Sequence, residues 1–133
     1  MSNRDSAVGV MRLGELRLLG FRLPSELDDV SDGEVLFLTR EGALTWVAKI
    51  LANWEVDEKL GQRLMEGWSD SALGDVIATW LLMRVVFKSE HHVQFLHTKN
   101  RKFEGLSLWE SIESGGHHEV RGYLASQVFT GSW

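Results

Sequence analysis

The sequence contains no cysteine and a single proline, Pro24, among its 133 residues. Without cysteine the chain forms neither a disulfide nor a thiolate metal site, a composition that fits the reducing cytoplasm. We therefore expect a cytoplasmic protein that is held together by its hydrophobic core. A chain of this length folds as one ordinary domain and buries about two-thirds of its unfolded surface, so a core of that kind is large enough.

Long apolar runs and basic clusters are absent as well. The most apolar stretch, Val76 to Phe87, is interrupted by Thr79 and Arg84 and is shorter than the ~20 residues of a membrane helix. The N-terminal residues show no signal-peptide pattern. The formal net charge is −5, so few cations are available to neutralise the phosphates of DNA. These features predict a protein without a membrane span and make DNA binding doubtful.

Apart from Asp and Glu, histidine is the only abundant metal-ligating residue type, but the spacing of the histidines does not suit a metal site. The five histidines are His91, His92, His97, His117 and His118. Adjacent histidines on a helix point about 100° apart, and no HExxH spacing occurs. No serine lies in a nucleophile-elbow motif. We therefore expect no metal site and no cofactor, and a protein that is not an enzyme.

Tryptophan is frequent. The six residues of this type are Trp46, Trp54, Trp68, Trp80, Trp109 and Trp133. Most buried tryptophans fill cores, but the residue is also enriched where interfaces gain most of their binding energy. We expect most of the six to lie in the core and one or two to contact a partner.

Helix signals dominate from residue 31 onward. Ser31 and Glu34 fit a capping box, and Thr39 or Arg40 offers another helix start, before apolar residues at helical spacing that end near Asn53. Met11 to Leu23 could form a short helix or a strand, and no other stretch indicates a strand. The expected fold is all-α, a compact multi-helix bundle with a C-terminal helical hairpin and a less regular N-terminal arm.

The later helices are more sharply marked. Asp57 and Gly67 bound one helix, and a central helix that is apolar on nearly all sides runs from Ser69 or Asp70 to Phe87. Gly74 and Ala78 would let another helix approach that central helix closely. A short helix is expected from Glu90 to His97.

The C-terminal part is predicted to hold two helices. Ser107 and Glu110 form a second capping box, Gly115-Gly116 ends that helix, and a last helix starts near His117. Gly122 inside it costs about 1 kcal/mol relative to alanine, which suggests close contact with another backbone.

This ordered series of motifs resembles the toxin-binding domain of the Xre/MbcA/ParS antitoxin family (DUF2384-like). The matching residues are Phe95-Leu96, Asn100, Gly105, Ser107-Leu-Trp-Glu110, Gly115 and Val120-Arg-Gly-Tyr-Leu124. The similarity covers about 72–126, is weaker over 46–67, and does not include the first 30 residues or so. Lys99 and Leu108 stand where the family usually has proline. The family's recognition helix has no counterpart, because Trp68 leads almost directly into the central helix.

The resemblance implies an antitoxin of a type II toxin–antitoxin system, which binds a RES-domain, NAD-attacking toxin and occludes its active site. It implies partner-binding roles for Arg121 and Tyr123, and closeness to the chain end adds Gln127, Phe129 and Trp133 as candidates. It also implies a homodimer. The chain then divides into an N-terminal arm (1–30), a reduced helix-turn-helix-like region (31–68) and a toxin-binding domain (69–133).

Two other functions remain open. One is a DNA-binding transcriptional autorepressor, which the sequence disfavours because no polar helix is left to enter a major groove. The other is a family-derived dimerisation or scaffold protein without a toxin.

Overall fold

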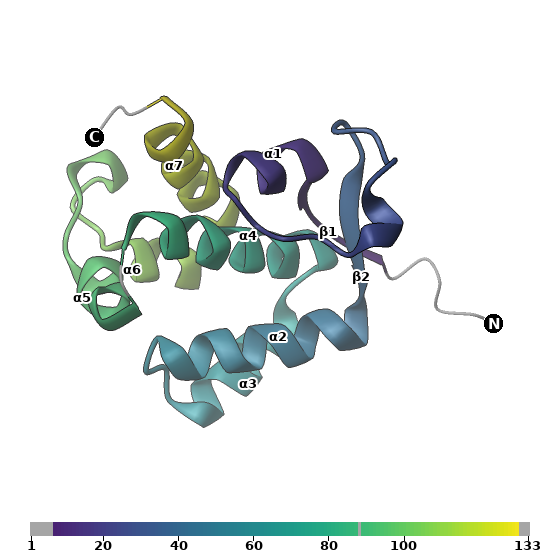
Figure 1. The fold of residues 1–133 in the computed structure, drawn as a ribbon. Coiled ribbons are helices and arrows are strands. Elements are labelled where there is room, and N and C mark those ends of the chain that lie inside the picture. The colour runs from purple at the N-terminus through teal and green to yellow at the C-terminus, as the bar shows by residue number, and fades with distance from the viewer. Residues whose placement is uncertain (1–6, 88, 131–133) are drawn as a thin grey trace.

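The computed structural model describes residues 7–87 and 89–130, which form seven α-helices and one two-stranded antiparallel sheet (Figure 1). The strands are β1 (Ala7–Arg12) and β2 (Val35–Thr39). The helices are α1 (Leu13–Leu18), α2 (Arg40–Asn53), α3 (Glu58–Gly67), α4 (Asp70–Val86), α5 (His92–His97), α6 (Leu108–Glu113) and α7 (His117–Thr130). Three single-turn 3-10 helices, η1 (Ser25–Leu27), η2 (Ser89–His91) and η3 (Arg101–Phe103), lie in the connections. None of the described helices is long and apolar enough to cross a membrane.

The fold is mainly helical, but the expectation of a purely α-helical protein is wrong. β1 and β2 pair with Ala7 opposite Thr39 and Gly9 opposite Phe37. The helix start expected at Ser31 is also wrong: the Gly33 N–H donates to Ser31 Oγ (3.2 Å), which closes a turn before β2.

The N-terminal segment, expected to be a less regular arm, is part of the core. Its buried apolar residues are Val8, Val10, Met11, Leu13 and Leu16. β1 packs against α4 so closely that a Cβ atom added at Gly74 would lie 2.0 Å from the carbonyl oxygen of Gly9. The close approach predicted for Gly74 is therefore confirmed, with a strand as the neighbour instead of a helix.

The predicted helix starts are confirmed where a side chain caps the first turn. Thr39 Oγ1 accepts a hydrogen bond from the Gly42 N–H (3.0 Å), and Asp57 accepts from the Lys59 and Leu60 N–H groups (3.1 and 3.2 Å). Ser69 Oγ accepts from the Ala72 N–H (3.1 Å). Such caps satisfy first-turn N–H groups that have no partner within the helix.

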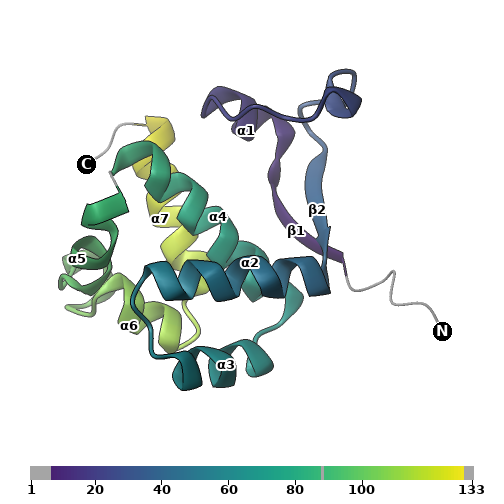
Figure 2. The ribbon, with the colours of Figure 1, turned by 60° about the horizontal axis from the view of Figure 1, so that its bottom comes forward.

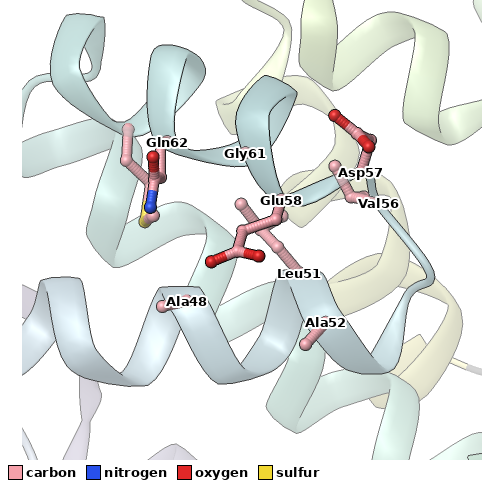
Figure 3. A pocket seen from close by; sticks show the side chains of 9 residues that line it. Ala48, Leu51, Ala52, Val56, Asp57, Glu58, Gly61 and Gln62 are labelled. Atoms are coloured by element: carbon pink, nitrogen blue, oxygen red, sulfur yellow. The ribbon is translucent and has the colours of Figure 1, made fainter.

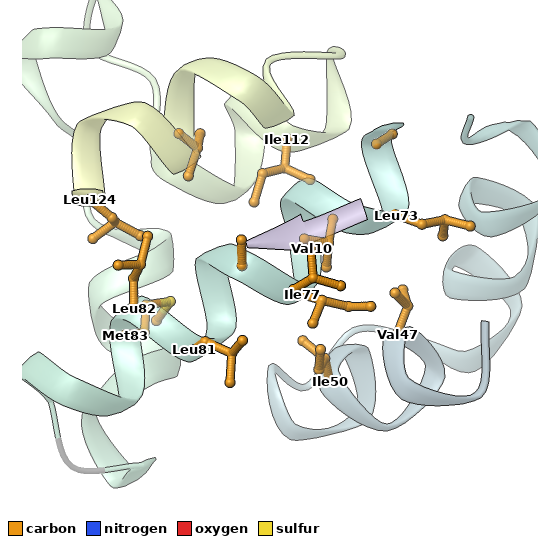
Figure 4. Packing of buried hydrophobic residues seen from close by; sticks show 14 of the residues in the cluster. Val10, Val47, Ile50, Leu73, Ile77, Leu81, Leu82, Met83, Ile112 and Leu124 are labelled. Carbon is orange, nitrogen blue, oxygen red and sulfur yellow. The ribbon is translucent and has the colours of Figure 1, made fainter. Parts of the chain in front are cut away.

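The core is built around α4, as its all-round apolar pattern predicts. Figure 4 shows side chains of α4 between those of α2 on one side and those of α6, α7 and β1 on the other. Ile77 of α4, Val47 of α2 and Leu124 of α7 are all nearly inaccessible to solvent. The position of α7 is thus set by its contact with α4.

Candidate partner-binding site

The candidate site lies in the segment that carries the family-like motifs, and local hydrogen bonds shape that segment. Asn100 Oδ1 accepts from the Lys102 N–H (2.9 Å), and Gly105 adopts a φ of +85°, a conformation that glycine tolerates best. Gly115, with a φ of +96°, follows the end of α6. These residues turn the chain from α5 through α6 into α7.

The capping box of α6 is confirmed. The Glu110 N–H donates to Ser107 Oγ (3.0 Å), and the Ser107 N–H donates to Glu110 Oε1 (2.8 Å). Lys99 Nζ also donates to Glu110 Oε1 (2.8 Å). The Lys99 hydrogen bond first, and the Ser107 backbone second, lower the pKa of Glu110 to about 2. Glu110 therefore stays ionised at neutral pH and holds the start of α6.

One face of α7 is buried and includes a predicted partner-binding residue. His117, Val120, Leu124 and Gln127 form this face. Gln127 is 2% exposed, and its Oε1 accepts no hydrogen bond within the described residues. Its side chain packs inside the chain instead of lying on a surface that a partner could reach.

Arg121 and Tyr123 are half-buried and already have intramolecular contacts. Arg121 Nη1 donates to Asp75 Oδ1 (3.0 Å), and Asp75 is a buried residue of α4 (5% exposed). The Tyr123 ring meets the Phe103 ring edge-on, with 5.5 Å between centroids. Arg121 therefore joins α7 to α4, and Tyr123 joins α7 to the loop before α6.

Among the predicted residues that the structure describes, Phe129 is the most exposed, at 38%. Trp133 lies outside the described residues. The structure thus does not bring the predicted residues onto one surface: Gln127 points inward, Arg121 and Tyr123 lie on opposite flanks of α7, and Phe129 lies on the outside.

The outer face of α7 includes three residues that were not predicted to bind a partner, Glu119, Gly122 and Ser126. Gly122 and Ser126 are exposed at helical spacing with Glu119 and Phe129. A Cβ atom added at Gly122 would meet nothing within 4 Å, so no described part of the chain makes the close backbone contact that this glycine suggested. The lack of a side chain at Gly122 was the feature of the sequence that could have indicated this face. We call Glu119, Gly122, Ser126 and Phe129 the α7 outer face.

Two of the five histidines have structural roles. His92 is buried, with Nε2 3.2 Å from the Phe87 carbonyl oxygen. His117 meets the Trp68 ring edge-on, with 4.8 Å between centroids, and its burial lowers its pKa. Within the described residues no group of three or more His, Asp or Glu side chains is placed to hold a metal ion.

The expectation that no polar helix is left free is wrong, because α3 is polar and mostly exposed. Its charges are balanced: Lys59 and Arg63 are offset by Glu58 and Glu66. Phosphate contacts need an excess of cations. The argument against DNA binding therefore changes: a polar helix is present, but its balanced charge disfavours contact with phosphates.

A hollow of about 310 Å³ separates α2 from α3 (Figure 3). Leu51 forms its buried wall, and the carboxylates of Asp57 and Glu58 lie at its border. A Cβ atom added at Gly61 would make an ordinary contact with a Leu51 methyl group, 3.4 Å away, so α3 packs against α2 at this position. Among the residues that line it, the hollow brings together no group of catalytic residues.

No protein-family model, curated protein or solved structure matches the chain.

Proposed function

We propose that the chain is a cytoplasmic antitoxin of a type II toxin–antitoxin system, which binds a RES-domain toxin through the α7 outer face and the residues that follow it, and occludes the toxin's active site. The observation that supports the proposal most is the uncovered α7 outer face beside the family-like motifs. The lack of a side chain at Gly122 allows another protein to approach this face closely. The exposed Phe129 offers that protein an apolar anchor.

Gly122 gives this proposal its physical basis. Glycine inside a helix costs about 1 kcal/mol relative to alanine, and no contact among the residues that the structure describes offsets that cost. An approaching backbone or ring could use the space. Arg121, held by Asp75 at the edge of the same helix, would keep its remaining donors for a carboxylate of the partner.

The first test is to express the chain together with the protein encoded by the adjacent reading frame. We expect that neighbour to contain a RES domain, to stop growth when expressed alone and to co-purify with the chain. A neighbour without a RES domain, or growth arrest that the chain does not relieve, would contradict the proposal.

Gly122→Arg is expected to abolish neutralisation of the toxin while leaving the fold intact. The arginine side chain would extend from the exposed face of α7 without meeting another described residue, but it would clash with a docked partner. The measurements are growth rescue on co-expression and the thermal unfolding midpoint. Gln62→Arg on α3 is the matched control and should rescue growth as well as the unmodified chain does. Normal rescue by Gly122→Arg would exclude the α7 outer face as the toxin site.

The homodimer is also a proposal, and β2 is its best support. One edge of β2 pairs with β1, and within the described residues no strand pairs with the other edge. Figure 2 shows β2 at the margin of the molecule. Its residues, Val-Leu-Phe-Leu-Thr, include no charge that would protect an exposed edge from further pairing. Two copies can pair such edges antiparallel across a two-fold axis.

Phe37→Lys is therefore expected to convert a dimer into a folded monomer. Phe37 is 58% exposed, and lysine on an edge strand opposes pairing with another strand. Light scattering during gel filtration measures the mass. Leu18→Lys, at another exposed apolar residue, is the control and should remain dimeric. An unmodified chain that is monomeric at every concentration would contradict the dimer.

A further inference from the structure

Two tryptophans are not enclosed by the core. Trp54, Trp68 and Trp109 are buried, whereas Trp46 of α2 is 43% exposed and Trp80 of α4 is partly exposed. The Trp46 and Trp80 rings meet edge-to-face, with centroids 5.5 Å apart and planes at 71°. The two rings form an apolar ridge where α2 and α4 lie side by side. Core packing therefore does not account for a tryptophan at position 46, because much of its surface remains exposed.

The surroundings of the ridge are cationic. The Arg84 guanidinium lies 4.9 Å from the centre of the Trp80 ring, one helical turn further along α4. Lys49 follows Trp46 by three positions on α2, so the two residues are neighbours on the helix surface. Beyond Arg84 a hollow of about 350 Å³ opens between α2 and α4, lined by Asn53, Trp80, Arg84 and His92. No carboxylate lines it among the residues that the structure describes.

These cations also lack ion-pair partners. In the described ranges neither Arg84 nor Lys49 takes part in a salt bridge, although the chain as a whole has a net charge of −5. Arg17, Arg40 and Arg121 are each paired with an aspartate, whereas Arg84 belongs to the described arginines that have no salt bridge. Exposed cations that no carboxylate neutralises across a salt bridge can attract a negative group from elsewhere.

We infer that Trp46, Lys49, Trp80 and Arg84, which together we call the tryptophan–arginine patch, bind an acidic segment of another protein. An apolar side chain of that segment contacts the exposed part of Trp46, and an adjacent Asp or Glu carboxylate accepts hydrogen bonds from Arg84. The guanidinium fork suits a carboxylate, and tryptophan and arginine are the residue types that dominate interface binding energies. The inference does not rest on the antitoxin proposal, because the patch lies on α2 and α4, whereas the proposed toxin site lies on α7.

Two other occupants fit less well. A second copy of the chain would place the patch against the same patch across a two-fold axis, which brings Arg84 and Lys49 close to identical charges. A single-stranded nucleic acid would need aromatic faces for base stacking. One face of Trp80 is covered by Arg84, and two cations neutralise few of the phosphates of a strand. An acidic protein segment requires neither a free ring face nor more than the two cations present.

The test begins with selection of short random peptides, displayed on phage, against the immobilised full-length chain. We expect the selected peptides to combine Asp or Glu with a large apolar residue. Synthetic copies are then titrated by fluorescence anisotropy. Arg84→Glu should weaken their binding at least about tenfold, the factor that corresponds to 1.4 kcal/mol. Trp46→Ala should weaken it by a similar factor, and added salt should weaken it progressively.

The matched control is Lys59→Glu, which makes the same change in net charge on the exposed surface of α3. It should change the affinity less than twofold, which separates a local carboxylate contact from general attraction. Circular dichroism shows whether Arg84→Glu is folded, and Arg84→Gln takes its place if it is not. The inference is wrong if no acidic peptide is selected, if Lys59→Glu reduces binding as much as Arg84→Glu, or if oligothymidylate binds the patch more tightly than the peptides do.

Discussion

Gly74→Ala is expected to lower the free energy of unfolding by about 3 kcal/mol, the upper part of the range for an overpacked core. The added methyl group would lie 2.0 Å from the Gly9 carbonyl oxygen, a backbone atom that moves only if β1 moves. The gain in helix propensity, about 1 kcal/mol, does not offset this clash. Urea denaturation followed by tryptophan fluorescence measures the change.

The same substitution at Gly122 is the control for this result. Both glycines lie inside helices, but a Cβ atom at Gly122 meets nothing within 4 Å. Gly122→Ala is therefore expected to raise the free energy of unfolding by up to about 1 kcal/mol. Equal effects at the two positions would mean that β1 does not pack against α4 as described.

Arg121→Met is expected to have the second largest effect, a loss of about 2–3 kcal/mol. It leaves the carboxylate of Asp75, which is 5% exposed, without the guanidinium that neutralises it. Arg121 itself is about a quarter exposed, with 26% of its side-chain surface accessible, so the loss is smaller than for a fully buried ion pair. His118, at 3.8 Å from Asp75, is too exposed to replace it.

A double-mutant cycle with Asp75→Asn separates this structural role from a role in partner binding. Once Asp75 is neutral, Arg121→Met should cost less than about 1 kcal/mol, because no buried charge is then left unpaired. If the cost is unchanged in the Asp75→Asn background, the ion pair does not explain it. If toxin neutralisation is lost in the stable double variant, Arg121 contacts the partner as well.

Helices α2, α3, α4 and α6 could be predicted because their start signals are local. Thr39, Asp57, Ser69 and Ser107 each cap a helix through an N–H group two or three positions further along the chain. The sheet could not be predicted in the same way, because β1 and β2 come together from distant parts of the chain. Residues 35–39 do have the apolar and β-branched composition of a strand, a signal that the apparent capping box at Ser31 obscured.

The candidate site was less predictable than the fold because burial depends on the partner helix. The spacing of Val120, Leu124 and Gln127 indicates that they share a face, but only the position of α4 shows that this face is buried. In the same way, the charge of Arg121 does not show that Asp75 lies beside it. Gly74 and Gly122 look alike in sequence, and only the packing distinguishes a crowded glycine from an exposed one.

The place of β1 in the core also bears on how the chain is synthesised. A ribosome releases residues 7–12 first, before β2 and α4 exist to cover their apolar side chains. Val8 and Val10 must therefore stay exposed to solvent, or to a chaperone, until the middle of the chain has emerged. β1 is made well before α4, its main helical neighbour, and this delay gives the newly made chain a period in which it can aggregate.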